Sequence, residues 1–141
     1  MLELLQTKLR VVRCLGPASV LDSLDPGTST TCRVAADELL LLGWDGNLPT
    51  LGHGLALDHS DAFAAFAFKG DRADEAFSRL SEVELPDERP AFVQGAVATV
   101  PAKVVVEENR ILVLVSSSLG HHLRERALES CADLELVEGN A

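Results

Sequence analysis

The sequence is poor in aromatic and in basic residues. Its 141 residues include no tyrosine, one tryptophan and five phenylalanines, and 12 Lys and Arg stand against 22 Asp and Glu, for a net charge of −10. Negative charge repels a phosphate backbone and an anionic membrane, and scarce aromatic rings leave few surfaces on which bases could stack. We therefore expect neither a nucleic-acid partner nor a membrane partner.

Long apolar runs are also missing. No stretch approaches the ~20 apolar residues of a membrane-spanning helix, and the first residues lack the basic start, apolar centre and cleavage site of a secretory signal. The expected location is therefore the cytoplasm. Three cysteines, at positions 14, 32 and 131, are an odd number at wide spacing in apolar surroundings. This pattern predicts free buried thiols.

Residue patterns that carry chemistry are scarce as well. The four histidines do not have zinc-site spacing. In particular, the adjacent His121 and His122 point in different directions on a helix and cannot bind one ion together. Residues 58–61, Asp-His-Ser-Asp, hold the residue types of a hydrolytic triad, but neighbours on an extended segment alternate faces. Local bonding of Asp and Ser to the backbone is the preferred interpretation. The glycines between 43 and 54 lack the Gly-Lys-Ser/Thr of a phosphate loop. We expect no catalytic residue, metal or cofactor in this chain.

The most strongly patterned segment runs from Gly95 to Cys131. Residues 96–106 are apolar at alternate positions and predict a strand, which Pro101 requires to be an edge strand, bulged, or divided in two. Residues 111–115 are all apolar and predict a strand buried on both faces, joined to the first by a tight turn at Asn109. Ser118 is expected to cap a helix with an apolar stripe from Leu119 to Cys131.

The rest of the chain predicts two further groups of elements. Residues 1–6 are a frayed or docked terminus, 7–15 a strand, 17–24 a helix, and 28–35 with 39–42 a second hairpin. After a turn-rich connector at 43–54 come a central strand at 62–68 and a helix capped by Asp71, with its apolar stripe on Ala73, Ala76, Phe77 and Leu80. An acidic segment, 81–94, leads to the central hairpin. A last strand is expected at 134–137, with residues 139–141 frayed.

This order predicts an α+β fold, with antiparallel or mixed sheets and helices on one face. The order is β-α-β-β, followed by the ferredoxin-like β-α-β-β-α-β. We expect residues 1–141 to form a single domain, with internal halves at roughly 7–42 and 61–137 joined by loop 43–60.

Four short segments resemble the aminomethyltransferase-like folate-binding fold: 36–42, 58–61, 68–80 and 92–99. A fifth segment, 114–123, narrows the resemblance. The short length and the last segment, Leu-Val-Ser-Ser-Ser-Leu-Gly-His-His-Leu, look most like the gamma subunit of heterotetrameric sarcosine oxidase. The resemblance implies a noncatalytic gamma-type subunit of a flavin-dependent N-methyl amine oxidase, in one-carbon metabolism. It would stabilise the larger, folate-handling subunit. It also implies that FAD, FMN, NAD, tetrahydrofolate and zinc are bound by the larger subunits.

Two alternatives remain open at this point. A stand-alone folate- or pterin-binding module would need an acidic residue for the pterin ring, for which Asp45, Asp58 and Asp61 are candidates. A ferredoxin-like regulatory domain would instead dimerise through a strand edge. If larger partner subunits exist, the candidate contacts are Trp44, Leu48 and Leu51, because a lone Trp in a turn-rich segment is either core or an interface anchor.

Overall fold

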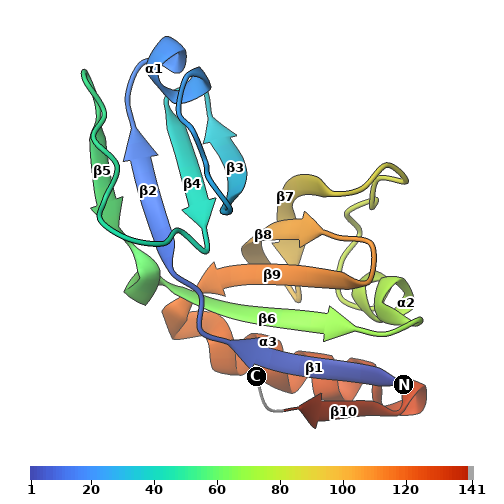
Figure 1. The fold of residues 1–141 in the computed structure, drawn as a ribbon. Coiled ribbons are helices and arrows are strands. Elements are labelled where there is room, and N and C mark those ends of the chain that lie inside the picture. Colours follow the sequence, from blue (N-terminus) through green and yellow to red (C-terminus); the bar gives the residue numbers. More distant parts are fainter. Residues whose placement is uncertain (140–141) are drawn as a thin grey trace. The chain divides into compact units, whose positions relative to one another are not determined.

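Two β-sheets carry the fold in the computed structural model, which describes residues 1–139 (Figure 1). The chain separates into two compact units, one of Met1–Lys8 with everything from Ala62 onward, the other of Leu9–Asp61. The first unit holds a six-stranded sheet and the second a four-stranded one. The fold is of the α+β class.

The larger sheet has the strand order β10-β1-β6-β9-β8-β7. Its strands are β1 (Leu2–Thr7), β6 (Phe63–Lys69), β7 (Ala91–Val97), β8 (Val100–Val106), β9 (Arg110–Ser116) and β10 (Leu136–Gly139). The β1–β10 pair is parallel, and every other pair is antiparallel. Helices α2 (Ala73–Ser78) and α3 (Gly120–Ser130) bury Phe77 and Leu123 in the same core as Phe66 and Phe68 of β6. Both helices therefore pack on one face of this sheet.

The smaller sheet has the order β3-β4-β2-β5 and is antiparallel throughout. Its elements are β2 (Val11–Leu15), α1 (Ala18–Asp22), β3 (Thr30–Ala35), β4 (Glu38–Leu42) and β5 (Leu55–Asp58). Strands β2 and β4 contribute Val12, Cys14 and Leu41 to a core that also holds Leu21 of α1. Short 3-10 turns follow β5, β9 and α3, at Ser60–Ala62, Ser117–Leu119 and Ala132–Leu134.

Several local predictions are confirmed. The β8–β9 hairpin turns at residues 107–109 and is closed by Glu107 N–H donating to Arg110 O. Residues Ile111–Val115 of β9 are all buried. The predicted hairpin in the first part of the chain forms as β3 and β4. All three cysteines are free and buried, and burial raises the pKa of the Cys32 thiol to about 12.

The single strand predicted at residues 7–15 is wrong. The chain forms β1 and β2 instead, interrupted at Lys8–Arg10. Leu2 and Leu4 are buried in the core of the larger unit, whereas Val12 and Cys14 belong to the core of the smaller one. The apolar alternation continues from β1 into β2, although the two strands belong to different sheets. The sequence pattern alone therefore cannot show where one strand ends and the next begins.

The strand predicted at 96–106 is divided in two, one of the three outcomes that Pro101 left open. β7 and β8 form a tight hairpin whose turn residues, Ala98 and Thr99, have φ of 51° and 69°. The β8–β9 ladder begins at Ala102, so Pro101 occupies an interior strand without interrupting the pairing to β9. Two other expectations are wrong: neither Asp71 nor Ser118 caps its helix, since α2 and α3 have no side-chain cap hydrogen bond. The prediction that 139–141 fray falls partly on residues 140–141, outside the described residues.

The predicted element order also needs correction. β5 forms within what was expected to be loop 43–60, and β1 lies between β10 and β6 in the larger sheet. Pairing to β1 is nonlocal, since Leu4 faces Phe68 and Leu2 faces Leu136. The expectation of a single domain stays a prediction.

The strained turn of the β7–β8 hairpin supports a stability prediction. Thr99 is exposed and β-branched, and left-handed backbone costs such a residue about 1–2 kcal/mol. Thr99→Gly should therefore raise the urea midpoint of unfolding. The net gain in unfolding free energy should be about 0.5–1 kcal/mol, because glycine relieves the strain but gives the unfolded chain more backbone entropy. Thr50→Gly is the matched control, because Thr50 is exposed with no positive φ. A midpoint lowered equally in both variants would contradict the strain argument.

Candidate functional site

The three folate candidates, Asp45, Asp58 and Asp61, lie in the smaller unit. Asp45 is exposed in the connector between β4 and β5, Asp58 ends β5, and Asp61 is exposed in the 3-10 turn that follows. None of the three aspartates lines either of two open hollows in the larger unit that are described below.

Asp58 is occupied by local contacts. Its Oδ1 accepts hydrogen bonds from the hydroxyl of Ser60 at 2.7 Å and from the backbone N–H of Ser60 at 3.1 Å. Its Oδ2 accepts from Nε of Arg10 at 3.3 Å. These bonds, the Ser60 hydroxyl first, lower the pKa of Asp58. The expected bonding to local backbone is present in the Ser60 N–H to Asp58 bond. Ser60 Oγ also accepts from Val11 N–H of β2 at 2.9 Å, a nonlocal bond that was not expected.

The connector between β4 and β5 is held to its unit by Arg10 and Trp44. The Arg10 guanidinium donates to the carbonyl oxygens of Trp44, at 3.3 Å, and of Gly46. The Trp44 indole donates to Asn47 O at 2.8 Å, and its ring packs against the core of the smaller unit. Trp44 is therefore partly a core residue.

The other two interface candidates lie in different surroundings. Leu51 is buried, with 9% of its surface exposed, and is part of the core of the smaller unit. Leu48 is exposed. Sequence reasoning missed two further exposed leucines on β5, Leu55 and Leu57. The alternation Leu-Ala-Leu-Asp after Gly54 was the available signal, but it lies within the predicted loop 43–60.

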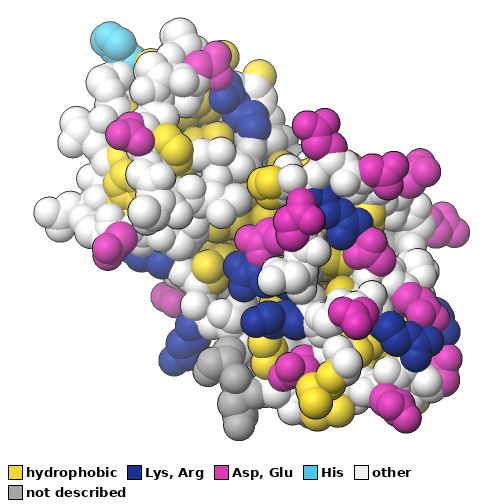
Figure 2. Space-filling model, turned by 45° about the vertical axis from the view of Figure 1, so that its right-hand side comes forward, with side chains coloured by type: hydrophobic (Ala, Val, Ile, Leu, Met, Phe, Trp, Pro, Cys, Tyr) yellow, Lys and Arg dark blue, Asp and Glu magenta, His cyan; other side chains and the backbone are white. Residues whose placement is uncertain are grey.

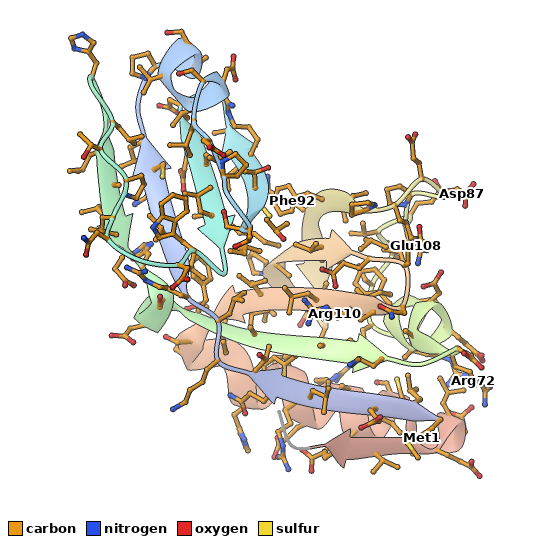
Figure 3. All side chains as sticks on the ribbon, viewed as in Figure 1. Met1, Arg72, Asp87, Phe92, Glu108 and Arg110 are labelled. Carbon is orange, nitrogen blue, oxygen red and sulfur yellow. The ribbon has the colours of Figure 1, made fainter. Side chains whose placement is uncertain are left out.

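The first hollow in the larger unit has a volume of about 500 Å³ and a charged lining. Acidic and basic side chains alternate around it, and Met1, Glu108 and Arg110 of this lining are labelled in Figure 3. Arg89 donates to both carboxylate oxygens of Asp74, at 3.0 and 2.6 Å, and to Pro86 O. This ion pair uses charges that would otherwise face a ligand, and the hollow lacks the apolar walls of a typical organic-ligand site.

The second hollow, of about 750 Å³, lies beside the β7–β8 turn and the end of α2. Two of its lining hydroxyls bond to backbone of the chain itself. Ser81 Oγ donates to Ala96 O at 2.7 Å, and Thr99 Oγ1 donates to Ala98 O at 2.6 Å. His122 Nε2 lies 3.0 Å from Ala98 O. This arrangement stabilises the hairpin and presents no nucleophile paired with a base.

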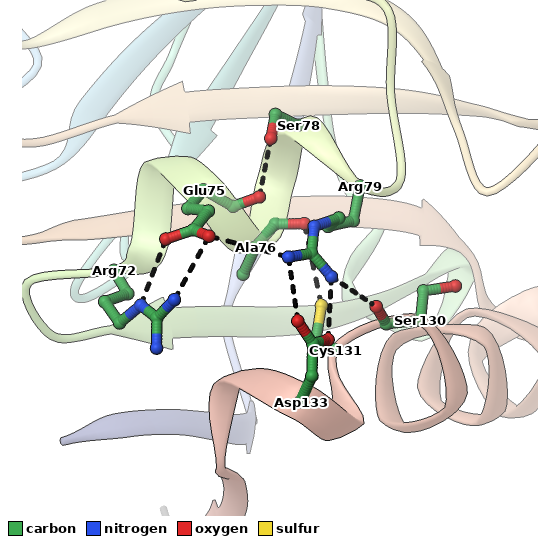
Figure 4. Close-up of polar contacts among 8 residues, drawn as sticks. All are labelled: Arg72, Glu75, Ala76, Ser78, Arg79, Ser130, Cys131 and Asp133. Atoms are coloured by element: carbon green, nitrogen blue, oxygen red, sulfur yellow. Dashed lines mark hydrogen bonds and ion pairs between the residues drawn. The ribbon is translucent and has the colours of Figure 1, made fainter.

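An ion-pair network joins α2 to the end of α3 (Figure 4). Arg79 donates to both carboxylate oxygens of Asp133, at 2.7 and 3.0 Å, and to Ser130 O at 3.2 Å. Arg72 donates to both oxygens of Glu75, at 3.0 and 3.1 Å. Glu75 also lies 3.5 Å from Arg79, which links the two pairs.

This network predicts acid sensitivity. Hydrogen bonding by Arg79 lowers the pKa of Asp133 from its ordinary 3.8, and Arg72 lowers the pKa of Glu75 from its ordinary 4.5. Both carboxylates therefore add stability that is fully present above those ordinary values and is lost as the pH falls through the lowered ones. The free energy of unfolding should fall on acidification below about pH 4.

Urea titrations of Asp133→Asn and wild type between pH 7 and pH 3 check this expectation. The difference in unfolding free energy between the two proteins should shrink towards pH 3. Glu84→Gln, at an exposed position, controls for loss of one negative charge. If the difference in unfolding free energy between wild type and Asp133→Asn stays constant with pH, the proposed role of the ion pair is contradicted.

Charge on the surface is mixed rather than gathered. Figure 2 shows acidic and basic side chains interspersed on the face in view, with the acidic ones more numerous. Among residues 1–139, no three His, Cys, Asp or Glu side chains could share a metal ion. No helix in this part of the chain is long and apolar enough to cross a membrane.

The chain is thus a small α+β protein of two sheets. No protein-family model matches it, and no curated protein matches it either. Among solved structures, the chain is similar to a chain of heterotetrameric sarcosine oxidase from Corynebacterium sp. U-96 in complex with pyrrole 2-carboxylate. The TM-score is 0.79 at 13% identity, over 94% of this chain and 84% of that one. A protein from Agrobacterium tumefaciens matches with a TM-score of 0.46 at 15% identity, over 99% of this chain and 93% of that one.

Proposed function

We propose that this chain is a noncatalytic, gamma-type subunit of a hetero-oligomeric flavin-dependent amine oxidase that acts on sarcosine or a related N-methyl amine. It binds and stabilises a larger, folate-handling chain. The larger chains hold FAD, FMN, NAD, tetrahydrofolate and zinc. The observation that carries the proposal is the likeness, along nearly the whole length of both chains, to one chain of heterotetrameric sarcosine oxidase.

Two features of the chain support a role in assembly. Hydrophobic residues make up 47% of the sequence, and large apolar side chains remain exposed at Leu48, Leu55 and Leu57. Such side chains on a small protein are typical of a surface that a partner covers. In addition, Arg89 and Asp74 in the lining of the first hollow are bonded to one another, which suits a scaffold better than a catalyst.

The test is purification of the tagged chain from its native cells under mild conditions. We expect larger chains, identified by mass spectrometry, to co-elute with it and the eluate to have a flavin absorption spectrum. The variant Phe77→Ala, which removes a core side chain of the larger unit, is the control and should lose these partners. A colourless chain that elutes alone would overturn the proposal.

A further inference from the structure

The four sheet edges formed by residues 1–139 differ in how they are protected. Edge strands expose backbone hydrogen-bonding groups, and proteins usually block them with charge, bulges or covering segments. β3 carries a bulge between Arg33 and Ala35, and the Arg33 side chain bonds to Ala35 O and Ala36 O. The edge of β7 is covered by the segment that follows α2, where Ser81 bonds to Ala96 O. β10 is short, and its Glu138 is paired with Arg124.

β5 is as short as β10 and its Asp58 is paired with Arg10, but it carries no bulge and has two exposed leucines. It pairs with β2 on one side only. Leu55 and Leu57 lie on the same face of β5, with 53% and 38% of their surfaces exposed. β5 itself contains no Lys, no Pro and no bulge. An edge with these properties is a template for pairing with another strand.

The register of the β2–β5 pair identifies the backbone groups that face outward. His59 N–H donates to Val11 O, and hydrogen-bonded pairs in an antiparallel ladder occur at every second residue. Leu55 and Leu57 therefore bond towards β2. The N–H and C=O groups of Ala56 and Asp58 point to the open side.

The charges near β5 favour a partner other than a second copy. Asp58 has a half-exposed carboxylate, and Asp45 and Asp61 in the flanking segments are exposed. Each copy of the chain carries a net charge of −10, so two copies would repel one another.

We propose that β5 accepts an added β-strand from the larger partner chain. The added strand is an extended segment with apolar side chains at alternate positions, against Leu55 and Leu57, and a Lys or Arg on the other face, near Asp58. Its backbone bonds to the outward-facing groups of Ala56 and Asp58. This inference rests on the proposed function, because the added strand comes from a larger chain of the assembly. It goes beyond that function by naming the strand edge that is used and the side chains that the added strand carries.

The experiment compares tagged wild type with Leu57→Lys and Val137→Lys, each purified from native cells. Val137 is the matched control, since it is 51% exposed on the edge strand β10. A lysine at position 57 replaces the apolar cross-strand contact with the added strand by a charge on the edge, so Leu57→Lys should retain the larger chains at least about tenfold less than wild type. Val137→Lys should retain them as wild type does. Circular dichroism must show that both variants fold.

Hydrogen–deuterium exchange gives a second readout on the wild type. In the purified complex, the amides of Ala56 and Asp58 should exchange at least about tenfold more slowly than in the isolated chain. If the larger chains co-elute but these amides keep their rates and Leu57→Lys retains the partners, the β5 proposal is overturned and the proposed function stands. If the chain elutes alone, both fail. If the wild-type chain instead forms a two-fold dimer that Leu57→Lys dissociates, the choice of the larger chain as occupant is also overturned.

Discussion

Phe77→Ala should cost about 3–5 kcal/mol of unfolding free energy, a large share of the roughly 5–15 kcal/mol that stabilises a typical domain. Phe77 is 1% exposed on α2 and packs in the core of the larger unit with the side chains of β6 and α3. The substitution removes a ring and leaves a cavity, because the strands around it are held by their ladders and cannot close the space. Urea unfolding followed by circular dichroism measures the effect.

Phe92→Ala is the control for this prediction. Phe92 is only partly buried on β7, where Figure 3 labels it. Removing the same ring there should cost far less, because water fills the space. Equal losses in the two variants would show that the α2 contact is not a main source of stability in the larger unit.

Gly70→Ala should be similarly damaging, for two reasons that add. Gly70 ends β6 with φ of +124°, which side-chain-bearing residues rarely adopt, and a Cβ there would overlap the carbonyl oxygen of Met1 and lie 3.0 Å from its carbon. The overlapping atoms are backbone atoms of Met1, directly before β1, and cannot rotate away as a side chain can. We expect a loss of about 2–5 kcal/mol, measured as a lowered urea midpoint.

Two other glycines separate these causes. Gly46 has φ of +86° and open space where a Cβ would lie, so Gly46→Ala tests the backbone conformation alone and should cost about 1–2 kcal/mol. Gly52 has open space and no left-handed φ, so Gly52→Ala should be neutral or add about 0.4–1 kcal/mol. If the urea midpoint of Gly70→Ala is no lower than that of Gly46→Ala, the clash with the Met1 backbone is refuted.

Much of the local structure could be predicted because its cause is local. Alternation and apolar runs predicted β9, and the apolar stripes predicted the buried faces of α2 and α3. The β7–β8 turn could not be predicted from Ala98 and Thr99, since neither favours positive φ. It is stabilised by distant groups: Ala98 N–H donates to Leu80 O at 2.7 Å, and His122 lies at hydrogen-bonding distance from Ala98 O.

The candidate interaction site shows the same division. Exposure of a leucine depends on its strand's place in the sheet, so the sequence could not distinguish Leu51, which is core, from Leu55 and Leu57, which are exposed.

The sequence by itself determined the α+β class, the central β8–β9 hairpin and the scarcity of catalytic motifs, because these follow from periodicity and residue type. Only the tertiary structure decided that β1 joins β6 and β10, and that β5 is an edge with backbone groups facing outward. Both depend on pairing between residues far apart in the chain, whose free energy comes from packing and not from local preference.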